Sequence, residues 1–302
     1  MKQKLIVILG PTAVGKTKFG VELADRFNGE IISADSRQVY KRMDIGTGKD
    51  LSDYKIGNRQ IPCHLIDILD PTEEFDLFKF QKSFKEVYTE ITVRQRIPFL
   101  VGGTALYIHS ILKNYQLTHV DFTSSRRIEL QQLSIDELKT MLSTKISKLH
   151  NTTDLIEKER MIKAILISEN QDSVSEEVQN EFTFLVIGLM DNRESIKSNI
   201  TDRLKYRLQN GMIEEVEALV EYGITFEKLD YFGLEYKFIG KYIKGELSYN
   251  DMYQKLNSAI HKFAKRQMTW FRKMEREGIE IHWVDKNNKD NVHPLIENFL
   301  SV

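Results

Sequence analysis

The sequence contains a single cysteine, Cys63, among its 302 residues. One cysteine excludes an internal disulfide framework and a zinc site built from several cysteines. No apolar run reaches the roughly 18 residues that a membrane-spanning helix needs, and an apolar strand at the very N-terminus leaves no room for a signal peptide. The formal net charge of −1 gives no overall electrostatic footprint for nucleic acid. These absences predict a cytoplasmic protein without membrane contact, and we expect a monomer.

What the sequence does contain is a complete phosphate-binding loop directly after an apolar stretch at residues 4–9. In the motif G-x-x-x-x-G-K-[ST], the glycines let consecutive backbone N–H groups surround an anion, the lysine adds positive charge, and the last hydroxyl can hold magnesium. The helix that follows would add its positive N-terminal end. We predict that a di- or triphosphate group, with Mg²⁺ on Thr17, binds the loop Gly10-Pro11-Thr12-Ala13-Val14-Gly15-Lys16-Thr17.

Strand patterns alternate with helical patterns over the first 110 residues, which is typical of a parallel α/β sheet. Residues 116–180 have helical spacing and little strand propensity, and they predict a small helical insertion. The predicted fold class is therefore α/β: a P-loop NTPase-like parallel sheet flanked by helices, formed by residues 1–115 and 181–302, with C-terminal helices and the insertion at 116–180. Strands are expected at 4–9, 30–34, 64–69, 98–101, 182–189 and 279–284, and helices at 194–222, interrupted at Gly211, and at 249–276.

Three candidate residues follow expected strands or face the loop. Asp35 comes directly after the strand at 30–34, where it could coordinate magnesium or act as a general base, although an N-cap aspartate would look the same. The turn Gly102-Gly103-Thr104 allows close backbone approach to a ligand and supplies a hydroxyl, but many helices begin in this way. Arg203, by its sequence alone, could equally lie on a solvated helix face. Ser36 and Gln38 could hydrogen-bond a base edge.

A local basic stretch stands out in this otherwise neutral chain. Residues 255–276 contain seven Lys or Arg residues and one acid, Glu275. On a helix, the cations would share one face while Met268 and Phe271 pack inward. Phosphate contacts and base stacking are the functional interpretation, and a basic amphipathic surface helix is the structural one. The candidates for nucleic-acid contact are Lys265, Arg266, Gln267, Thr269, Trp270 and Arg272.

Taken in chain order, these motifs resemble the tRNA dimethylallyltransferases, also called tRNA isopentenyltransferases. The resemblance covers most of the chain, with five blocks in the first 110 residues and one near the C-terminus. The C-terminal block is the most discriminating one, because a small-molecule kinase would not need it. The matching segments are residues 10–17, Ile32-Ser33-Ala34-Asp35-Ser36-Arg37-Gln38-Val39-Tyr40, Met43-Asp44-Ile45-Gly46-Thr47-Gly48-Lys49, residues 64–71, residues 101–107 and Lys265-Arg266-Gln267-Met268-Thr269-Trp270-Phe271-Arg272.

The resemblance implies a chemistry and a set of site residues. Dimethylallyl diphosphate would place its diphosphate in the loop, and N6 of adenosine 37, beside the tRNA anticodon, would attack the allylic carbon. The implied catalytic residues are Asp35 as base, with Thr104 and Arg203 holding diphosphate oxygens, and Mg²⁺ is the implied cofactor. The tRNA anticodon stem-loop is the implied partner. Its implied contacts, besides the basic stretch, are Asp35, Ser36, Arg37, Gln38, Thr104, Arg126, Glu159, Arg160, Met161, Ile162 and Lys163.

The sequence departs from the family pattern in several places. An arginine-rich segment is represented by residues 159–166, an arginine before Arg203 is replaced by Asn199, and a glycine-tyrosine-lysine segment appears as Gly233-Leu234-Glu235-Tyr236-Lys237. Three alternatives therefore remain at this stage. They are an adenylate isopentenyltransferase acting on free AMP, ADP or ATP, a P-loop kinase of a small metabolite, and a non-catalytic tRNA-binding paralogue.

Overall fold

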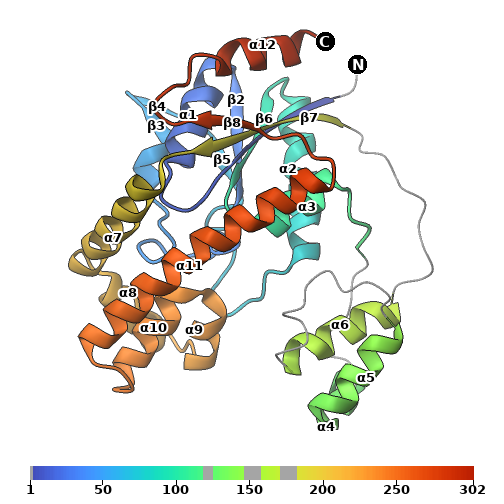
Figure 1. Ribbon diagram of the computed structural model, residues 1–302, viewed down its shortest axis with the longest axis vertical. Coiled ribbons are helices and arrows are strands. Elements are labelled where there is room, and N and C mark those ends of the chain that lie inside the picture. Colours follow the sequence, from blue (N-terminus) through green and yellow to red (C-terminus); the bar gives the residue numbers. More distant parts are fainter. Residues whose placement is uncertain (1–2, 118–124, 146–157, 171–181) are drawn as a thin grey trace. The chain divides into compact units, whose positions relative to one another are not determined.

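The computed structural model describes residues 3–117, 125–145, 158–170 and 182–302, and it divides into two compact units (Figure 1). Unit 1 comprises residues 1–113 and 180–302, and unit 2 comprises residues 114–179. The insertion expected at residues 116–180 thus corresponds to unit 2. Within the described ranges, no helix combines the length and the apolar content that crossing a bilayer requires.

Unit 1 is built on a six-stranded sheet in which all neighbouring strands are parallel. A parallel sheet is covered on both faces, so its strands are almost continuously apolar, as residues 5–9 and 185–189 are. The predicted α/β fold class is confirmed. The strand order is β5 (Cys63–His64), β2 (Gly29–Ala34), β6 (Ile97–Gly102), β1 (Gln3–Leu9), β7 (Phe182–Met190) and β8 (His282–Asp285), and a separate small hairpin joins β3 (Lys55–Ile56) to β4 (Arg59–Gln60).

Two hydrophobic cores lie on opposite faces of this sheet. Because successive side chains of a strand point to opposite faces, Leu5, Val7 and Leu9 of β1 join one core, and Ile6 and Ile8 join the other. The second core contains α1 (Lys16–Arg26) and α12 (Val292–Ser301). The first core contains α2 (Leu77–Val93), α3 (Ala105–Leu112), α7 (Arg193–Gln209), α8 (Met212–Glu221), α9 (Phe226–Phe232), α10 (Leu234–Ile243) and the long helix α11 (Tyr249–Arg276), which crosses Figure 1 in orange.

The functional loops meet because three parallel strands end together. Leu9 at the end of β1 is paired with Gly102 at the end of β6, and Gly102 is also paired with Ala34 at the end of β2. The segments that follow these strands are the phosphate-binding loop, Thr104 and Asp35. The parallel topology therefore places them at one edge of the sheet, where ligands of open α/β sheets bind.

Most of the expected helices and strands are present, but the prediction of a strand at 64–69 is wrong. The strand expected at 64–69 ends at His64, because Leu65 and Asp67 have φ values of 61° and 54°, which an extended strand cannot accommodate. The last strand begins at His282 rather than at residue 279. The helix at 249–276 is confirmed, and Gly211, with φ of 95°, separates α7 from α8 as the sequence predicts.

Unit 2 contains three described helices, α4 (Ser125–Gln132), α5 (Ile135–Lys145) and α6 (Lys158–Asn170). Its own small core is formed by apolar residues that recur at helical spacing. They are Leu130, Leu138, Leu142, Met161, Ile162, Ile165 and Leu166.

Candidate active site at the phosphate-binding loop

The loop at residues 10–17 has the backbone geometry that its sequence predicts. A Cβ on Gly10 would lie 2.4 Å from the carbonyl oxygen of Leu189, so only glycine fits against β7 there. Gly15, at φ of 95°, is the N-cap of α1, and Ala13 also has a positive φ of 65°. Left-handed residues alternating with right-handed ones turn backbone N–H groups toward one side, which forms a concave binding place for an anion.

Lys16 lies inside this loop and folds back on it. Its Nζ donates a hydrogen bond of 2.8 Å to the carbonyl oxygen of Pro11. Burial and the positive charge of Arg203 lower the pKa of Lys16 to about 7, against the opposite influence of Asp35. A lysine held in this way lacks a strong anionic partner of its own, so an added phosphate would be favoured there.

Arg203 closes the loop from the side of α7. Its Nη2 donates to the hydroxyl of Thr12 at 2.5 Å, and Asn199, one helical turn earlier, donates to the carbonyl oxygen of Ala13 at 3.3 Å. Burial and the charge of Arg207 lower the pKa of Arg203 to about 10. The solvated helix face is therefore excluded for Arg203, whose guanidinium is partly buried and hydrogen-bonded to the loop.

Asp35 and Thr104 face the same edge of the sheet from neighbouring strand ends. The Thr104 hydroxyl accepts a hydrogen bond of 3.1 Å from the Ser36 backbone N–H, and the Arg37 N–H donates to Asp35 Oδ1 at 2.9 Å. No hydrogen bond from the described part of the chain engages the other carboxylate oxygen, Oδ2. Asp35 is thus oriented by its own turn and keeps one oxygen for a ligand.

The side chains of Arg37 and Gln38 have partners of their own. The Arg37 guanidinium lies over the Tyr231 ring, 4.6 Å from its centroid. Gln38 donates to the carbonyl oxygen of Gly48 at 3.3 Å, and its amide oxygen accepts from the Ser33 hydroxyl at 3.3 Å. Both residues are partly exposed, so they border the site.

Gln267 requires a correction. We predicted a tRNA contact, but its side chain is buried, with 6% of the residue exposed, and it faces the loop. Its oxygen accepts from the Thr12 backbone N–H at 2.8 Å, and its Nε2 donates to the carbonyl oxygen of Gly103 at 2.8 Å. A Cβ on Gly103 would lie 2.6 Å from that nitrogen, which explains the glycine. Gln267 joins the two turns of the phosphate site.

The other residues of the basic stretch divide between the two faces of α11. Phe271 is fully buried, whereas Lys265, Arg266, Thr269 and Arg272 are exposed. The Trp270 ring packs edge-on against His109, with ring centroids 6.4 Å apart, and its Nε1 is buried, so only part of the indole can meet a ligand. The exposed face of α11 therefore presents cations to solvent, as the spacing predicts.

In unit 2, some of the candidates for tRNA contact are buried and others form ion pairs. Met161 and Ile162 are fully buried in the unit's core, so their side chains cannot contact tRNA, and that prediction is not kept. Arg126 pairs with Glu169 at 2.9 Å and with Glu129 at 2.7 Å. Glu159 pairs with Arg127 at 3.1 Å, while Arg160 and Lys163 belong to the same helix, α6.

Sequence reasoning missed the residue that holds the loop at 43–49. The Glu215 carboxylate, on α8, accepts hydrogen bonds from the backbone N–H groups of Asp44, Ile45 and Gly46 at 2.7, 2.7 and 3.0 Å. It also accepts from the Tyr236 hydroxyl at 2.8 Å. The loop motif was visible in the sequence, but nothing in the sequence links it to an acid 171 residues away.

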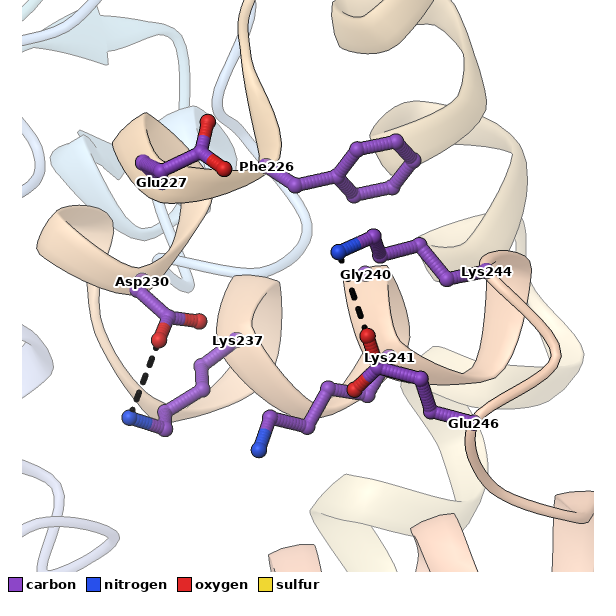
Figure 2. Close-up of a pocket in the computed structure, with 8 residues that line it drawn as sticks. All are labelled: Phe226, Glu227, Asp230, Lys237, Gly240, Lys241, Lys244 and Glu246. Atoms are coloured by element: carbon purple, nitrogen blue, oxygen red, sulfur yellow. Dashed lines mark ion pairs between the residues drawn. The ribbon is translucent and has the colours of Figure 1, made fainter.

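A hollow of about 170 Å³ lies elsewhere, between α9 and α10 (Figure 2). Its charges largely neutralise one another, because Lys237 pairs with Asp230 and Lys244 with Glu246, each at 3.1 Å. None of its lining residues belongs to the phosphate-binding loop or to the turns beside it. They are Phe226, Glu227, Asp230, Lys237, Gly240, Lys241, Lys244 and Glu246.

Comparisons with known proteins identify the family of the chain. A family model described as IPP transferase matches residues 38–274, and one described as isopentenyl transferase matches residues 3–61. A tRNA dimethylallyltransferase 1 of Geotalea uraniireducens is 52% identical over 285 residues, which cover 94% of this chain and 93% of the relative. A tRNA dimethylallyltransferase 2 of Syntrophotalea carbinolica is 48% identical and is covered in full, as is this chain.

Solved structures give the same result. The tRNA isopentenylpyrophosphate transferase of Bacillus halodurans is 33% identical, with a TM-score of 0.70 over 99% of this chain and 96% of that one. A eukaryotic dimethylallyltransferase acting on tRNA, 24% identical with a TM-score of 0.77 over 99% of this chain and 80% of that one, shares the fold. Fold and loop together define a P-loop-like α/β protein with partly buried cations beside the loop at residues 10–17. The chain belongs to the IPP transferase family and is a prenyltransferase, which confirms the resemblance seen in the sequence.

Proposed function

We propose that this protein transfers the dimethylallyl group of dimethylallyl diphosphate to N6 of adenosine 37 in tRNA. The observation that carries the proposal is the arrangement of Lys16 and Arg203, two partly buried cations, around a phosphate-binding loop next to the partly free carboxylate of Asp35. An anion-binding place and a proton acceptor side by side suit a reaction in which an anion leaves while a nucleophile loses a proton. The names of the relatives point to the same substrates.

The diphosphate end of the donor would bind the loop. Lys16, Arg203 and the loop N–H groups are fixed by the fold before the reaction starts, so they stabilise the charge that develops as diphosphate leaves. Thr104 fits the same role, because its oxygen already accepts from Ser36 and its own O–H remains available to a phosphate oxygen. A bound anion would also reduce the repulsion between Lys16 and Arg203, which favours anion binding further.

The donor set also fits a magnesium ion bound together with the diphosphate. The described residues hold no cluster of three His, Cys, Asp or Glu side chains, so the protein offers no complete cage. Magnesium characteristically uses one or two protein oxygens and completes its shell with phosphates and water. The Thr17 hydroxyl, in the first turn of α1, would be that protein ligand, and the ion would neutralise charge on the diphosphate.

Asp35 would act as the general base. The N6 lone pair of adenine forms the new bond to C1 of the dimethylallyl group, and the C–O bond to diphosphate breaks with its electrons going to the leaving oxygen. The N6 proton goes to Asp35 Oδ2, while Oδ1 stays bound to the Arg37 N–H. The turn at Ser36–Gln38 would contact the base from the rim of the site.

The tRNA would be held by contacts that the small donor does not need. Adenosine 37 must leave the anticodon-loop stack to reach Asp35, which costs little in a single-stranded loop. The exposed face of α11, with Lys265, Arg266, Thr269 and Arg272, would contact the backbone around it. In unit 2, Arg126, Glu159, Arg160 and Lys163 remain proposed contacts.

The test uses two anticodon stem-loop RNAs that differ only at position 37, incubated with labelled dimethylallyl diphosphate and magnesium. We expect incorporation into the adenosine-37 RNA and none into the guanosine-37 RNA, because only adenine presents an amine at C6. A site built around that amine rejects an analogue lacking it by about 10⁴-fold or more. Equal incorporation into both RNAs contradicts the proposal. Prenylation of AMP alone would indicate an adenylate isopentenyltransferase, and ATP turnover with a small acceptor would indicate a kinase.

A further inference from the structure

Arg207 lies one turn beyond Arg203 on α7, about 6 Å further along the helix axis. Its guanidinium rests directly on the backbone of Gly48, where an added Cβ would lie 1.8 Å from Nη2. The side chain is partly buried, yet no hydrogen bond or ion pair from the described part of the chain engages it. A partly buried guanidinium with unused N–H donors, next to a phosphate site, is equipped to bind an anion.

Its neighbours place Arg207 on the Asp35 side of the phosphate site. Gly48, against which its guanidinium lies, accepts a hydrogen bond of 3.3 Å from Gln38, three residues after Asp35, whereas Arg203 reaches Thr12 of the loop. Burial lowers the pKa of Arg207, and Asp35 and Glu235 oppose that change. Arg203 therefore faces the loop, and Arg207 faces the turn that follows Asp35, where the C–O bond of the donor would break.

Glu235 is the carboxylate whose charge acts most strongly on Arg207. It stands in the first turn of α10, in the segment where this sequence departs from the family's glycine-tyrosine-lysine pattern. Burial raises the pKa of Glu235, and the charge of Arg207 acts in the opposite direction. A buried carboxylate near an unpaired guanidinium keeps that guanidinium favourable in a site that is otherwise rich in positive charge.

We propose that Arg207 is a second guanidinium contact for the departing diphosphate, and that the charge of Glu235 balances that of Arg207 in the free site. This inference rests on the proposed function. Arg203 and the loop bind the outer part of the diphosphate, and Arg207 binds the oxygens nearest the breaking bond, where negative charge increases in the transition state. Its contribution should therefore be larger to kcat than to donor binding.

A purely structural role makes a different prediction. If Arg207 only neutralises Glu235, removing Arg207 leaves a buried carboxylate uncompensated, and removing both charges repairs the damage. If Arg207 acts on the diphosphate, the double substitution restores nothing. Arg207→Met, Glu235→Gln and the double variant separate the two roles, and Lys205→Met, an exposed lysine on the same helix, is the control for loss of one charge.

The experiment measures single-turnover rates and donor KM with an adenosine-37 stem-loop, together with the affinity for inorganic pyrophosphate. We expect Arg207→Met to lower the rate about 10²-fold with a smaller change in KM. Glu235→Gln should stay within about tenfold of the wild type because the guanidinium remains. The double variant should be as slow as Arg207→Met, and Lys205→Met should match the wild type. Added ethylguanidinium should partly restore the rate of Arg207→Ala and should leave the rate of Lys205→Met unchanged.

Two outcomes would overturn the proposal, and each assigns Arg207 a different role. Recovery of rate in the double variant would show that Arg207 serves only to neutralise Glu235. A change confined to the KM of the RNA would make Arg207 an acceptor contact. Thermal melting identifies a variant that fails to fold, and in that case Arg207→Lys, which keeps the charge, must still lower kcat. If the wild-type protein does not prenylate the RNA at all, the proposed function fails rather than this inference.

Discussion

Gln267, on the C-terminal helix α11, accepts a hydrogen bond of 2.8 Å from the backbone N–H of Thr12 in the phosphate-binding loop, 255 residues earlier in the chain. The same amide donates to the turn before Thr104, so one side chain fixes the relative position of the two turns. The helix whose outer face carries the exposed cations therefore also shapes the site from its inner face. The proposed diphosphate site and the proposed tRNA contacts are therefore linked through α11.

Replacing Gln267 by Leu should weaken dimethylallyl diphosphate binding and lower stability. The Thr12 N–H and the Gly103 carbonyl would each lose a buried partner, which costs about 1–3 kcal/mol of unfolding free energy for a group left unsatisfied. Donor KM and chemical denaturation measure the two effects. Gln254→Leu, an exposed glutamine on the same helix, is the matched control. Equal effects of the two substitutions would mean that Gln267 has no special place in the site.

The sequence predicts those parts of the site that follow from local pattern and sheet topology. The motif at 10–17 specifies the backbone geometry of its loop, and parallel strands bring Asp35 and Thr104 to it because their ends are in register. The partners of these residues could not be predicted in the same way. Gln267 resembles any residue of a basic helix, and its inward direction depends on how α11 packs.

Side-chain direction also explains the two corrections in unit 2. Met161 and Ile162 occupy a segment that the family resemblance marked for tRNA contact, but both are apolar residues that the unit's small core needs.

The strand predicted at 64–69 is wrong for a different reason. Its apolar pattern is that of a strand, whereas the left-handed conformations of Leu65 and Asp67 are imposed by tertiary contacts, such as the bond from the Asp67 N–H to the carbonyl oxygen of Gln38.

Asp35→Asn should leave the fold and donor affinity intact but lower the single-turnover rate by roughly 10²–10⁴-fold, the range for losing a general base. The amide can still accept the Arg37 N–H, so the turn should persist, but it cannot take the N6 proton. Ser36→Ala changes the same turn without removing the base and should have a much smaller effect. A rate for Asp35→Asn within a few-fold of the wild type would exclude Asp35 as the base.

The pKa of Lys16 predicts how pH affects diphosphate binding. With a pKa of about 7 in the free site, Lys16 is charged below that pH and loses its proton above it. A bound diphosphate favours the charged form and raises the pKa, so binding at pH 8 should take up a proton, and affinity should fall as pH rises from 6 to 8. Calorimetry with pyrophosphate in buffers of different ionisation enthalpy measures the uptake. Lys16→Met reports the titration of pyrophosphate itself, and a pH profile identical to that of wild type would contradict the assignment.

Replacing Lys265, Arg266 and Arg272 together by Ala should weaken tRNA binding while the affinity for dimethylallyl diphosphate changes little. Removing one cation that binds a phosphate should reduce the slope of log affinity against log salt by roughly 0.7 to 0.9. Filter binding of tRNA across a salt series measures that slope. Lys82, Lys85 and Arg96, exposed cations on and just after α2, replaced together provide a variant of equal charge outside α11. An equal reduction of donor and tRNA binding would assign the exposed face of α11 a structural role instead.

Gly48→Ala should reproduce the effect of losing Arg207 while leaving that arginine in the sequence. A Cβ at Gly48 would overlap the Arg207 guanidinium, and the flexible end of the arginine can move away, so the guanidinium should leave its place near the diphosphate.

Gly48 also has φ of 68°, which adds about 1 kcal/mol of backbone strain for alanine. The control for that strain is Gly57→Ala, because Gly57 has φ of 58° and an added Cβ there meets nothing within 4 Å. Both variants should lose similar stability in chemical denaturation, but only Gly48→Ala should slow single-turnover transfer, approaching the rate of Arg207→Met. If the two glycine variants transfer the dimethylallyl group equally fast, the position of Arg207 against Gly48 does not matter for the reaction.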